Sequence, residues 1–198
     1  MDGVNIIMKN YQELKEWMQV EKKVYFGSQP VGFNYKLRKT TKYEIYRYIM
    51  LLRKYEYFCY KRDHSKNMLG SKYWIMRVKL CDRNKNIQGI KLGIEITPGY
   101  TEKGIRICHQ NVIINGYIGE GCIFHGNNVI GNKKTGSVNA IPRIGANVDV
   151  GAGAIIIGDV TIADNCIIGA GAVVTQSFLT PGTIIAGVPA KAIESKKD

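Results

Sequence analysis

Residues 144–174 read IGANVDVGAGAIIIGDVTIADNCIIGAGAVV, and every sixth position carries a β-branched apolar residue. These positions are Ile144, Val150, Ile156, Ile162, Ile168 and Val174. Four residues after each of the first five comes a small or compact side chain, namely Val148, Ala154, Val160, Cys166 and Ala172. Glycine or alanine usually follows the apolar residue, as at Gly145, Gly151, Ala163 and Gly169, and glycine suits turns that need positive φ.

A strict six-residue period predicts a parallel β-helix, in which each unit is one short strand and a tight turn. Three units complete one triangular coil, and the apolar residue of each unit points inward onto its equivalent in the next coil. A buried amphipathic helix would need a period of about 3.6 residues, which this pattern does not follow. The predicted fold class is therefore mainly β, preceded by an α-helical region.

The repeat begins before this stretch and is interrupted once. Ile118, Phe124 and Ile130 are also six residues apart, but fourteen residues separate Ile130 from Ile144. Fourteen residues correspond to two coil faces plus two residues, so the polar segment 132–143 is predicted to leave the coil as an excursion. Insertions of this kind tend to gather on the binding face of a repeat protein.

Length and composition bound the class of protein. A chain of 198 residues has material for one or two compact units. Its five cysteines are scattered without a C-x-x-C pair, which favours reduced thiols over a zinc site or a disulfide framework. The N-terminus lacks the pattern of a signal peptide, and no apolar run approaches the roughly 20 residues of a membrane span. We therefore expect a cytoplasmic protein that is soluble, or at most attached to a membrane surface.

Residues 1–90 are predicted to form a helical, basic region. Apolar residues recur at helical spacing in three segments, which are Tyr11–Val24, Tyr43–Tyr60 and Met68 to about Cys81. Thr40 and Thr41 are suited to cap the second helix. Turn-forming residues predict a loop at 28–35 and a turn at Asn84–Gly89.

Most of the charge lies in this helical region. The formal net charge is +12, and residues 36–85 contain fifteen Lys or Arg against four acids. Such a patch is either a solvated outer face or a surface that meets phosphates of a nucleotide cofactor, a lipid-linked glycan or an anionic membrane. No nucleic-acid partner is expected, because no known binding module is found and the aromatic residues have helix-core spacing.

Three histidines are available for acid–base chemistry. His64 lies at a charged helix end and is expected to be solvated. His109 lies between strand-like segments, fourteen residues after Glu95. A carboxylate beside an imidazole raises its basicity, so these two residues are either a general-base pair or a structural histidine and a surface glutamate. His125 occupies a slot that holds Gly or Ala elsewhere, where it would fill a widened turn.

Four segments resemble the hexapeptide-repeat acetyltransferases, in particular a serine acetyltransferase-like branch associated with polysaccharide biosynthesis. They are GIEITPG at 93–99, GIRICHQNVIING at 104–116, the repeat at 142–174, and AGVPAK at 186–191, which is a specific family signature. The resemblance covers about half of the chain. It implies a left-handed parallel β-helix over 91–180 followed by a C-terminal segment at 181–198. It also implies a homotrimer with active sites between adjacent subunits, and acetyl-CoA as donor.

On this resemblance, His109 matches the family's catalytic histidine, which takes a proton from the acceptor hydroxyl. Glu95 falls where the family has a paired aspartate, although the spacing here is one residue shorter. The attacking oxygen would add to the thioester carbonyl, and a backbone N–H would stabilise the oxyanion. The residues implied to lie along CoA are Gly151, Ala152, Gly169, Ala170, Gly187, Pro189 and Lys191, with the lysine able to meet phosphate; no metal is implied.

Departures from the family concern the acceptor. Serine acetyltransferases carry an aspartate just before the catalytic histidine and an Arg-His-Pro ahead of the regular coils, where this chain has Cys108 and Ala140-Ile141-Pro142. A site without those charged partners should bind a zwitterion poorly. We therefore expect a hydroxyl of a capsular or exopolysaccharide sugar, on a glycan or lipid-linked glycan, with Cys108 and His125 beside the acceptor.

Three other functions stay open. Serine O-acetylation for cysteine synthesis is the nearest alternative to sugar O-acetylation. A non-catalytic trimeric scaffold on the same fold would tolerate the loss of His109. A zinc hydratase would need three converging histidines, and only two lie in the predicted β-helix.

Overall fold

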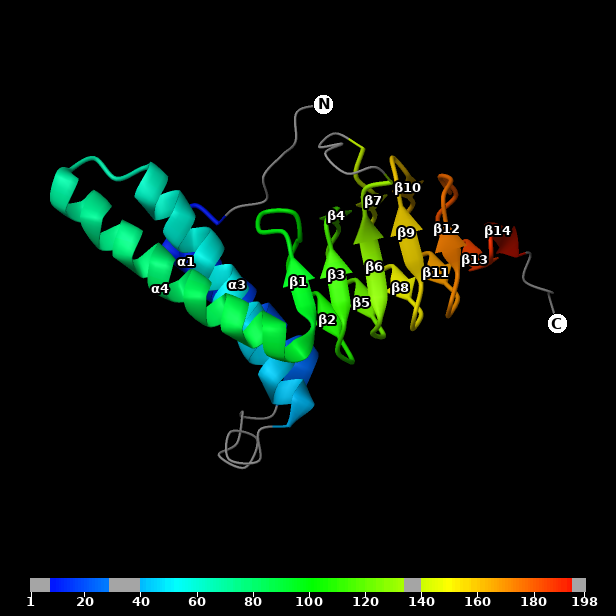
Figure 1. Ribbon diagram of the computed structural model, residues 1–198, viewed down its shortest axis with the longest axis horizontal. Helices are drawn as coiled ribbons and strands as arrows, with labels where there is room; N and C mark the ends of the chain where they lie inside the picture. The colour runs from blue at the N-terminus through cyan, green and yellow to red at the C-terminus, as the bar shows by residue number, and fades with distance from the viewer. Residues whose placement is uncertain (1–7, 29–39, 134–139, 194–198) are drawn as a thin grey trace. The chain divides into compact units, whose positions relative to one another are not determined.

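The computed structural model describes residues 8–28, 40–133 and 140–193. The chain divides into two compact units, Met1–Leu92 and Gly93–Asp198. The first unit is helical and the second consists of short strands (Figure 1). Most of the loop predicted at 28–35 and the middle of the predicted excursion fall outside the described residues.

Three helices are described in the first unit, and capping residues fix where two of them begin. They are α1 (Tyr11–Phe26), α3 (Thr41–Asp63) and α4 (Met68–Leu92). The Asn10 side chain accepts a hydrogen bond from the Glu13 N–H, and the Thr40 hydroxyl accepts one from the Tyr43 N–H. Such caps satisfy N–H groups that have no partner inside the helix. The predicted cap at Thr40 is confirmed.

The turn predicted at Asn84–Gly89 is wrong, because these residues continue α4. Lys85 and Gln88 lie on the buried face of the helix. The Gln88 amide donates to the Glu44 carboxylate at 2.6 Å and to the Glu44 carbonyl at 3.2 Å. Tertiary hydrogen bonding and burial therefore outweigh the weak helix propensity of asparagine and glycine.

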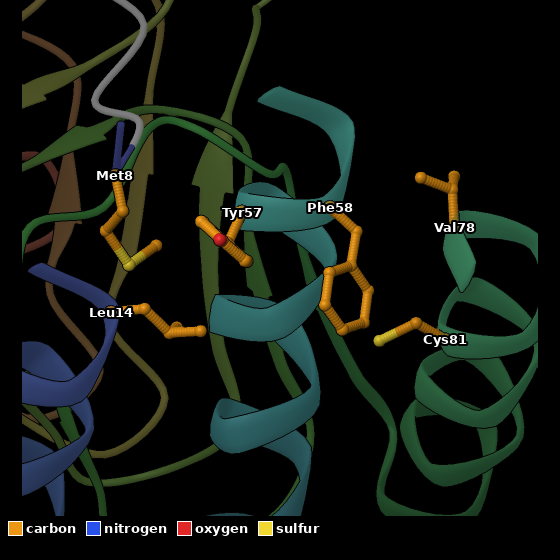
Figure 2. Close-up of a cluster of buried hydrophobic side chains, with 6 residues drawn as sticks. All are labelled: Met8, Leu14, Tyr57, Phe58, Val78 and Cys81. Atoms are coloured by element: carbon orange, nitrogen blue, oxygen red, sulfur yellow. The ribbon is translucent and has the colours of Figure 1, made fainter. Parts of the chain in front are cut away.

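The helical unit has an apolar core and a buried ionic cluster. Figure 2 shows Leu14 of α1 beside Tyr57 of α3, and Phe58 of α3 facing Cys81 of α4. The core cluster consists of Met8, Leu14, Tyr57, Phe58, Val78 and Cys81. Separately, the Arg53 guanidinium donates to Glu21 at 2.9 Å and to Glu56 at 3.2 Å.

The described strands of the second unit form three sheets. The first sheet contains β1 (Ile94–Ile96), β3 (Val112–Ile114), β6 (Asn128–Gly131), β9 (Ile155–Ile157) and β12 (Val173–Val174). The second contains β4 (Tyr117–Ile118), β7 (Arg143–Ile144) and β10 (Thr161–Ile162). The third contains β2 (Arg106–Ile107), β5 (Ile123–Phe124), β8 (Asp149–Val150), β11 (Ile167–Ile168), β13 (Ile184–Gly187) and β14 (Ala190–Ile193). Among the residues that the structure describes, all pairs of strands are parallel except β13 with β14.

The register confirms the predicted parallel coil. Ile155 pairs with Val173, so three six-residue units complete one turn of the coil. All six apolar residues of the repeat are at most 4% exposed, and the compact residues four positions later are also buried. The inward stacks therefore form the core of this unit.

The interruption of the repeat lies at one corner. Ile118 of β4 pairs with Ile144 of β7, a separation of 26 residues where the regular coil has 18. The excursion thus adds eight residues between neighbouring faces. The prediction that the fourteen residues from Ile130 to Ile144 correspond to two coil faces plus two residues is wrong, since they correspond to one face plus eight residues. Sequence spacing alone cannot distinguish an additional face from a longer corner.

Glycines that follow an inward residue have a different role from the one predicted. A Cβ atom at Gly151 would lie 2.5 Å from the backbone nitrogen of Ala170 in the next coil. Positive φ occurs elsewhere, for example at Asn111 and Asn127, whose side chains hydrogen-bond to each other at 3.0 Å. Asparagine tolerates the left-handed region, so it makes these turns while Gly151 permits close stacking of coils.

Candidate active site

One corner of the coil gathers most of the residues predicted to act in catalysis or binding. The N–H groups of Cys108, His125 and Gly151 each donate to a carbonyl of the next coil, at 2.8, 3.0 and 2.8 Å. These three residues and Gly169 follow directly on the paired strands β2, β5, β8 and β11, so they form one column. The residues that come next form a second column, namely His109, Gly126, Ala152 and Ala170. We call these two columns the site corner.

His109 is exposed and has space because its neighbour in the next coil is a glycine. A Cβ atom at Gly126 would lie 2.7 Å from the His109 Cβ. Gly126 also has a φ of 114°, which L side chains rarely adopt. Any other residue at this position would therefore collide with His109.

Glu95 lies on the first sheet rather than in the site corner. It pairs in register with Ile113, and its side chain is exposed. No hydrogen bond or ion pair joins Glu95 to His109 among the residues that the structure describes. The general-base pairing of these two residues stays a prediction.

His125 is held by a carboxylate that sequence reasoning missed. Its Nε2 atom lies 2.8 Å from Oδ1 of Asp149, and the two side chains are 45% and 43% exposed. A carboxylate that orients an imidazole is a recurring feature of general-base sites. The regular spacing could not predict this pair. One regular coil of 18 residues after His125 leads to Arg143, and the excursion changes the spacing between these two coils.

Asn128 joins two coils beneath the site corner and was also missed. This residue is fully buried. Its side chain accepts from the Gly126 N–H at 2.9 Å and donates to the Gly151 carbonyl at 2.8 Å. Buried amide groups need such partners, so Asn128 fixes the backbone that flanks His125 and supports His109.

The remaining residues implied to contact CoA lie at the end of the third sheet. The hairpin of β13 and β14 pairs Ala186 with Lys191, and therefore brings Gly187, Pro189 and Lys191 together. Gly169 donates its N–H to the Ile185 carbonyl at 2.8 Å, so the hairpin directly follows the site corner. The resulting strip exposes mainly glycine and alanine and ends near a cation. It suits an extended, amide-bearing chain with a terminal phosphate.

The thiols differ in their surroundings. Cys108 is half-buried in the site corner, whereas Cys122 is fully buried and its Sγ donates to the Gly145 carbonyl at 3.1 Å. Burial raises the pKa of Cys122 to about 11. Cys122 is therefore a structural residue.

Two further observations bear on binding sites. A cavity of about 690 Å³ lies in the helical unit, with Lys15, Lys22 and Lys54 among its lining residues and none of the predicted site residues. Within residues 8–28, 40–133 and 140–193, no group of three or more His, Cys, Asp or Glu side chains is arranged to hold a metal ion.

The fold agrees with the comparisons to known proteins. Residues 142–176 match the family model described as Bacterial transferase hexapeptide (six repeats). The second unit thus carries the repeat of hexapeptide transferases.

Relatives of the chain are acetyltransferases. The chain is 33% identical to a serine acetyltransferase of Synechococcus elongatus over 105 residues, which are 51% of this chain and 43% of that protein. It is 40% identical to the galactoside O-acetyltransferase of Escherichia coli over 67 residues, which are 33% of this chain and 32% of that protein. The chain therefore spans less than half the length of the curated relatives it matches.

Solved structures establish the fold. Soybean serine acetyltransferase superposes with a TM-score of 0.68 at 21% identity, covering 91% of this chain and 69% of the soybean chain. The serine acetyltransferase of Brucella abortus in complex with coenzyme A gives 0.62 at 17% identity, covering 94% and 70%. N-terminal helices followed by parallel coils are thus a known transferase architecture.

Proposed function

We propose that the protein is an acetyl-CoA-dependent O-acetyltransferase that works at the site corner. The observation that carries the proposal is that His109 and Gly151, Ala152, Gly169 and Ala170 lie on successive coils of one corner. The family resemblance supplies the roles, and all relatives named above transfer acetyl groups. The coil is taken as left-handed, as the same resemblance implies.

His109 acts as the general base in this mechanism. Its imidazole takes the proton of the acceptor hydroxyl while the oxygen attacks the thioester carbonyl carbon of acetyl-CoA. The tetrahedral oxyanion is stabilised by a backbone N–H. The carbon–sulfur bond then breaks, and the imidazolium returns its proton to the thiolate. The products are an acetyl ester and free CoA.

Acetyl-CoA lies along the strip from Gly151 to the hairpin. A pantetheine arm carries amides that can hydrogen-bond to backbone, and Gly151 and Gly169 leave the backbone accessible. Lys191 meets a phosphate as a point charge. The Brucella abortus structure, named as a complex with coenzyme A, supports this donor.

His125, Asp149 and Cys108 line the acceptor side. His125 lies one coil from Cys108 and next to Gly126, which abuts His109. Asp149 holds the His125 ring through Nε2. Nδ1 can then accept a hydrogen bond from another hydroxyl, or from an amine, of the molecule that receives the acetyl group. His125 is thus a residue that orients the acceptor while His109 performs the proton transfer.

L-serine is the leading candidate for the acetyl acceptor. Serine acetyltransferases predominate among the relatives and structural neighbours, which favours serine over the glycan expected from the sequence. The names of the relatives given above do not point to polysaccharide synthesis. A sugar hydroxyl is the second candidate, because a galactoside O-acetyltransferase is among the relatives and the Arg-His of serine enzymes is replaced by Ala140-Ile141.

We also propose a homotrimer with sites between subunits. Ile113 and Val129 project outward from the first sheet and are 44% and 38% exposed. Assembly would remove this apolar column from water. Light scattering should give three times the chain mass of 22.2 kDa.

An acceptor comparison tests the proposed function. The full chain is incubated with acetyl-CoA and either L-serine or a galactoside, free thiol is followed, and products are weighed by mass spectrometry. Acetylated serine supports the leading candidate, and acetylated galactoside without acetylated serine supports the second. Thiol release no faster than acetyl-CoA hydrolysis with both acceptors and with oligosaccharides would overturn the proposal.

A further inference from the structure

The outer face of α4 carries an exposed apolar stripe. Its members are Leu69, Tyr73, Met76, Leu80, Ile87 and Ile90, and each is between 46% and 84% exposed. Their spacing alternates between four and three residues, with Arg83 occupying one place in the series. At about 3.6 residues per turn, such positions fall on a single stripe about 100° wide. We call this set the α4 stripe.

Packing within the helical unit does not account for the α4 stripe. The residues that α4 buries are Val78, Cys81, Lys85, Gln88, Gly89 and Leu92, which lie on the opposite side of the helix. That opposite face packs against α3, because Gln88 donates a hydrogen bond to Glu44 and the Cys81 thiol donates one to the Leu51 carbonyl. Exposed apolar patches of this extent mark interaction surfaces.

Cations border the α4 stripe. Lys72, Lys79 and Arg83 are exposed, and none of them has an ion-pair partner among the residues that the structure describes. Arg77 stacks on Phe58 at 4.7 Å, and Lys91 lies 3.6 Å from Glu44. The one acid of the helix, Asp82, lies outside the stripe and is paired with Lys85 at 3.4 Å.

This charge pattern distinguishes two occupants. A second copy of α4 would place like charges opposite each other, because the positions that flank the stripe offer Lys and Arg without any Asp or Glu. An anionic bilayer complements both features, since acyl chains accept the apolar side chains and phosphates meet the cations. No described helix is long and apolar enough to cross a membrane.

We propose that α4 docks on the surface of an anionic phospholipid membrane, with the α4 stripe inserted at the interface and Lys72, Lys79 and Arg83 against lipid phosphates. Aromatic and aliphatic side chains at the stripe suit the headgroup boundary. This docking is separate from acetyl transfer and does not depend on it.

Vesicle sedimentation tests the proposal. The full chain is mixed with phosphatidylcholine vesicles with or without phosphatidylglycerol, and the bound fraction is measured at low and high salt. We expect binding only to vesicles that contain phosphatidylglycerol, weakened by salt. The double change Lys79→Gln and Arg83→Gln should lower the partition coefficient about 30-fold, from the usual effect of a basic residue near an anionic surface. A matched double change on α1, Lys22→Gln and Lys23→Gln, should lower it less than about threefold.

The apolar contribution has its own control. Leu80 lies within the α4 stripe, so Leu80→Ser should reduce vesicle binding. Ile75 is 39% exposed but lies outside the α4 stripe, so Ile75→Ser should leave vesicle binding unchanged. Circular dichroism verifies that each variant remains folded. Failure to bind either vesicle, or equal loss for the α1 and α4 doubles, would overturn the proposal. A change of oligomeric mass in Leu80→Ser without a change in vesicle binding would assign the stripe to a second copy instead.

Discussion

Replacing Arg53 should destabilise the helical unit more than any exposed charge does. The Arg53, Glu21 and Glu56 side chains are essentially fully buried, and the guanidinium reaches both carboxylates within 3.2 Å. Burial alone would lower the pKa of Arg53, but the charges of Glu56 and Glu21 raise it above its ordinary value. Arg53→Met keeps most of the side-chain volume and removes the Arg53 cation from two buried carboxylates. Breaking a buried pair in this way costs about 3–5 kcal/mol.

Urea unfolding followed by far-UV circular dichroism measures this loss. With a slope of about 1–3 kcal/mol per molar urea, the midpoint should fall by about 1 M or more. Arg47→Met is the matched control, since its side chain is 49% exposed and pairs with Glu44 at 3.3 Å, and it should cost about 0–1 kcal/mol. Replacing Glu21 and Glu56 by leucine as well should recover much of the loss, because the buried charges are then gone. Equal midpoints for Arg53→Met and Arg47→Met would refute this reasoning.

Three further outcomes are expected. Gly151→Ala should lower the melting temperature of the β-helix, because the added Cβ would press on the next coil at a cost of about 1–3 kcal/mol. Gly131→Ala is the control. The nearest atom to a Cβ at Gly131 is 3.8 Å away, so this change should alter stability by less than about 0.5 kcal/mol. The pKa of Glu44 is lowered from 4.5, because a side-chain hydrogen bond and two nearby cations outweigh the effect of burial. The stability that Glu44 contributes is therefore full above this value and lost as the pH falls through the lowered pKa, so Glu44→Gln should flatten the acid limb of a melting-temperature profile. Iodoacetamide at about pH 8 should label Cys108 well before Cys122, whose pKa is about 11; peptide mass spectrometry showing the reverse order would contradict the burial argument.

The sequence determines the coil because its signal is both local and repeated. Ile156 and its equivalents place one apolar side chain inward per face, and burial of that series confirms the pattern. The C-terminal part of α4 could not be predicted, for the opposite reason. Asn84–Gly89 has weak local propensity, and the contact of Gln88 with Glu44, which are 44 residues apart, decides its conformation.

The candidate site was predictable where it follows the repeat. Gly151 and Gly169 come from regular positions. The excursion lies between His125 and Asp149 in the sequence and changes their separation from the regular one, so spacing could not pair them. Asn128 could have been found, because it occupies the compact inward slot four residues after Phe124, which holds Val, Ala or Cys in the repeats of 144–174. A polar residue in that slot needs a buried hydrogen-bonding role.

The most direct test of the central claim is the rate of CoA release from acetyl-CoA by His109→Ala, measured with whichever acceptor the wild-type protein acetylates. Loss of a general base should lower this rate about 10²–10⁴-fold while the protein remains folded. His64→Ala is the control, since His64 is exposed in the helical unit and stacks on Tyr60, and its rate should equal the wild-type rate. Wild-type turnover in His109→Ala would contradict the assignment of the site corner as the catalytic centre.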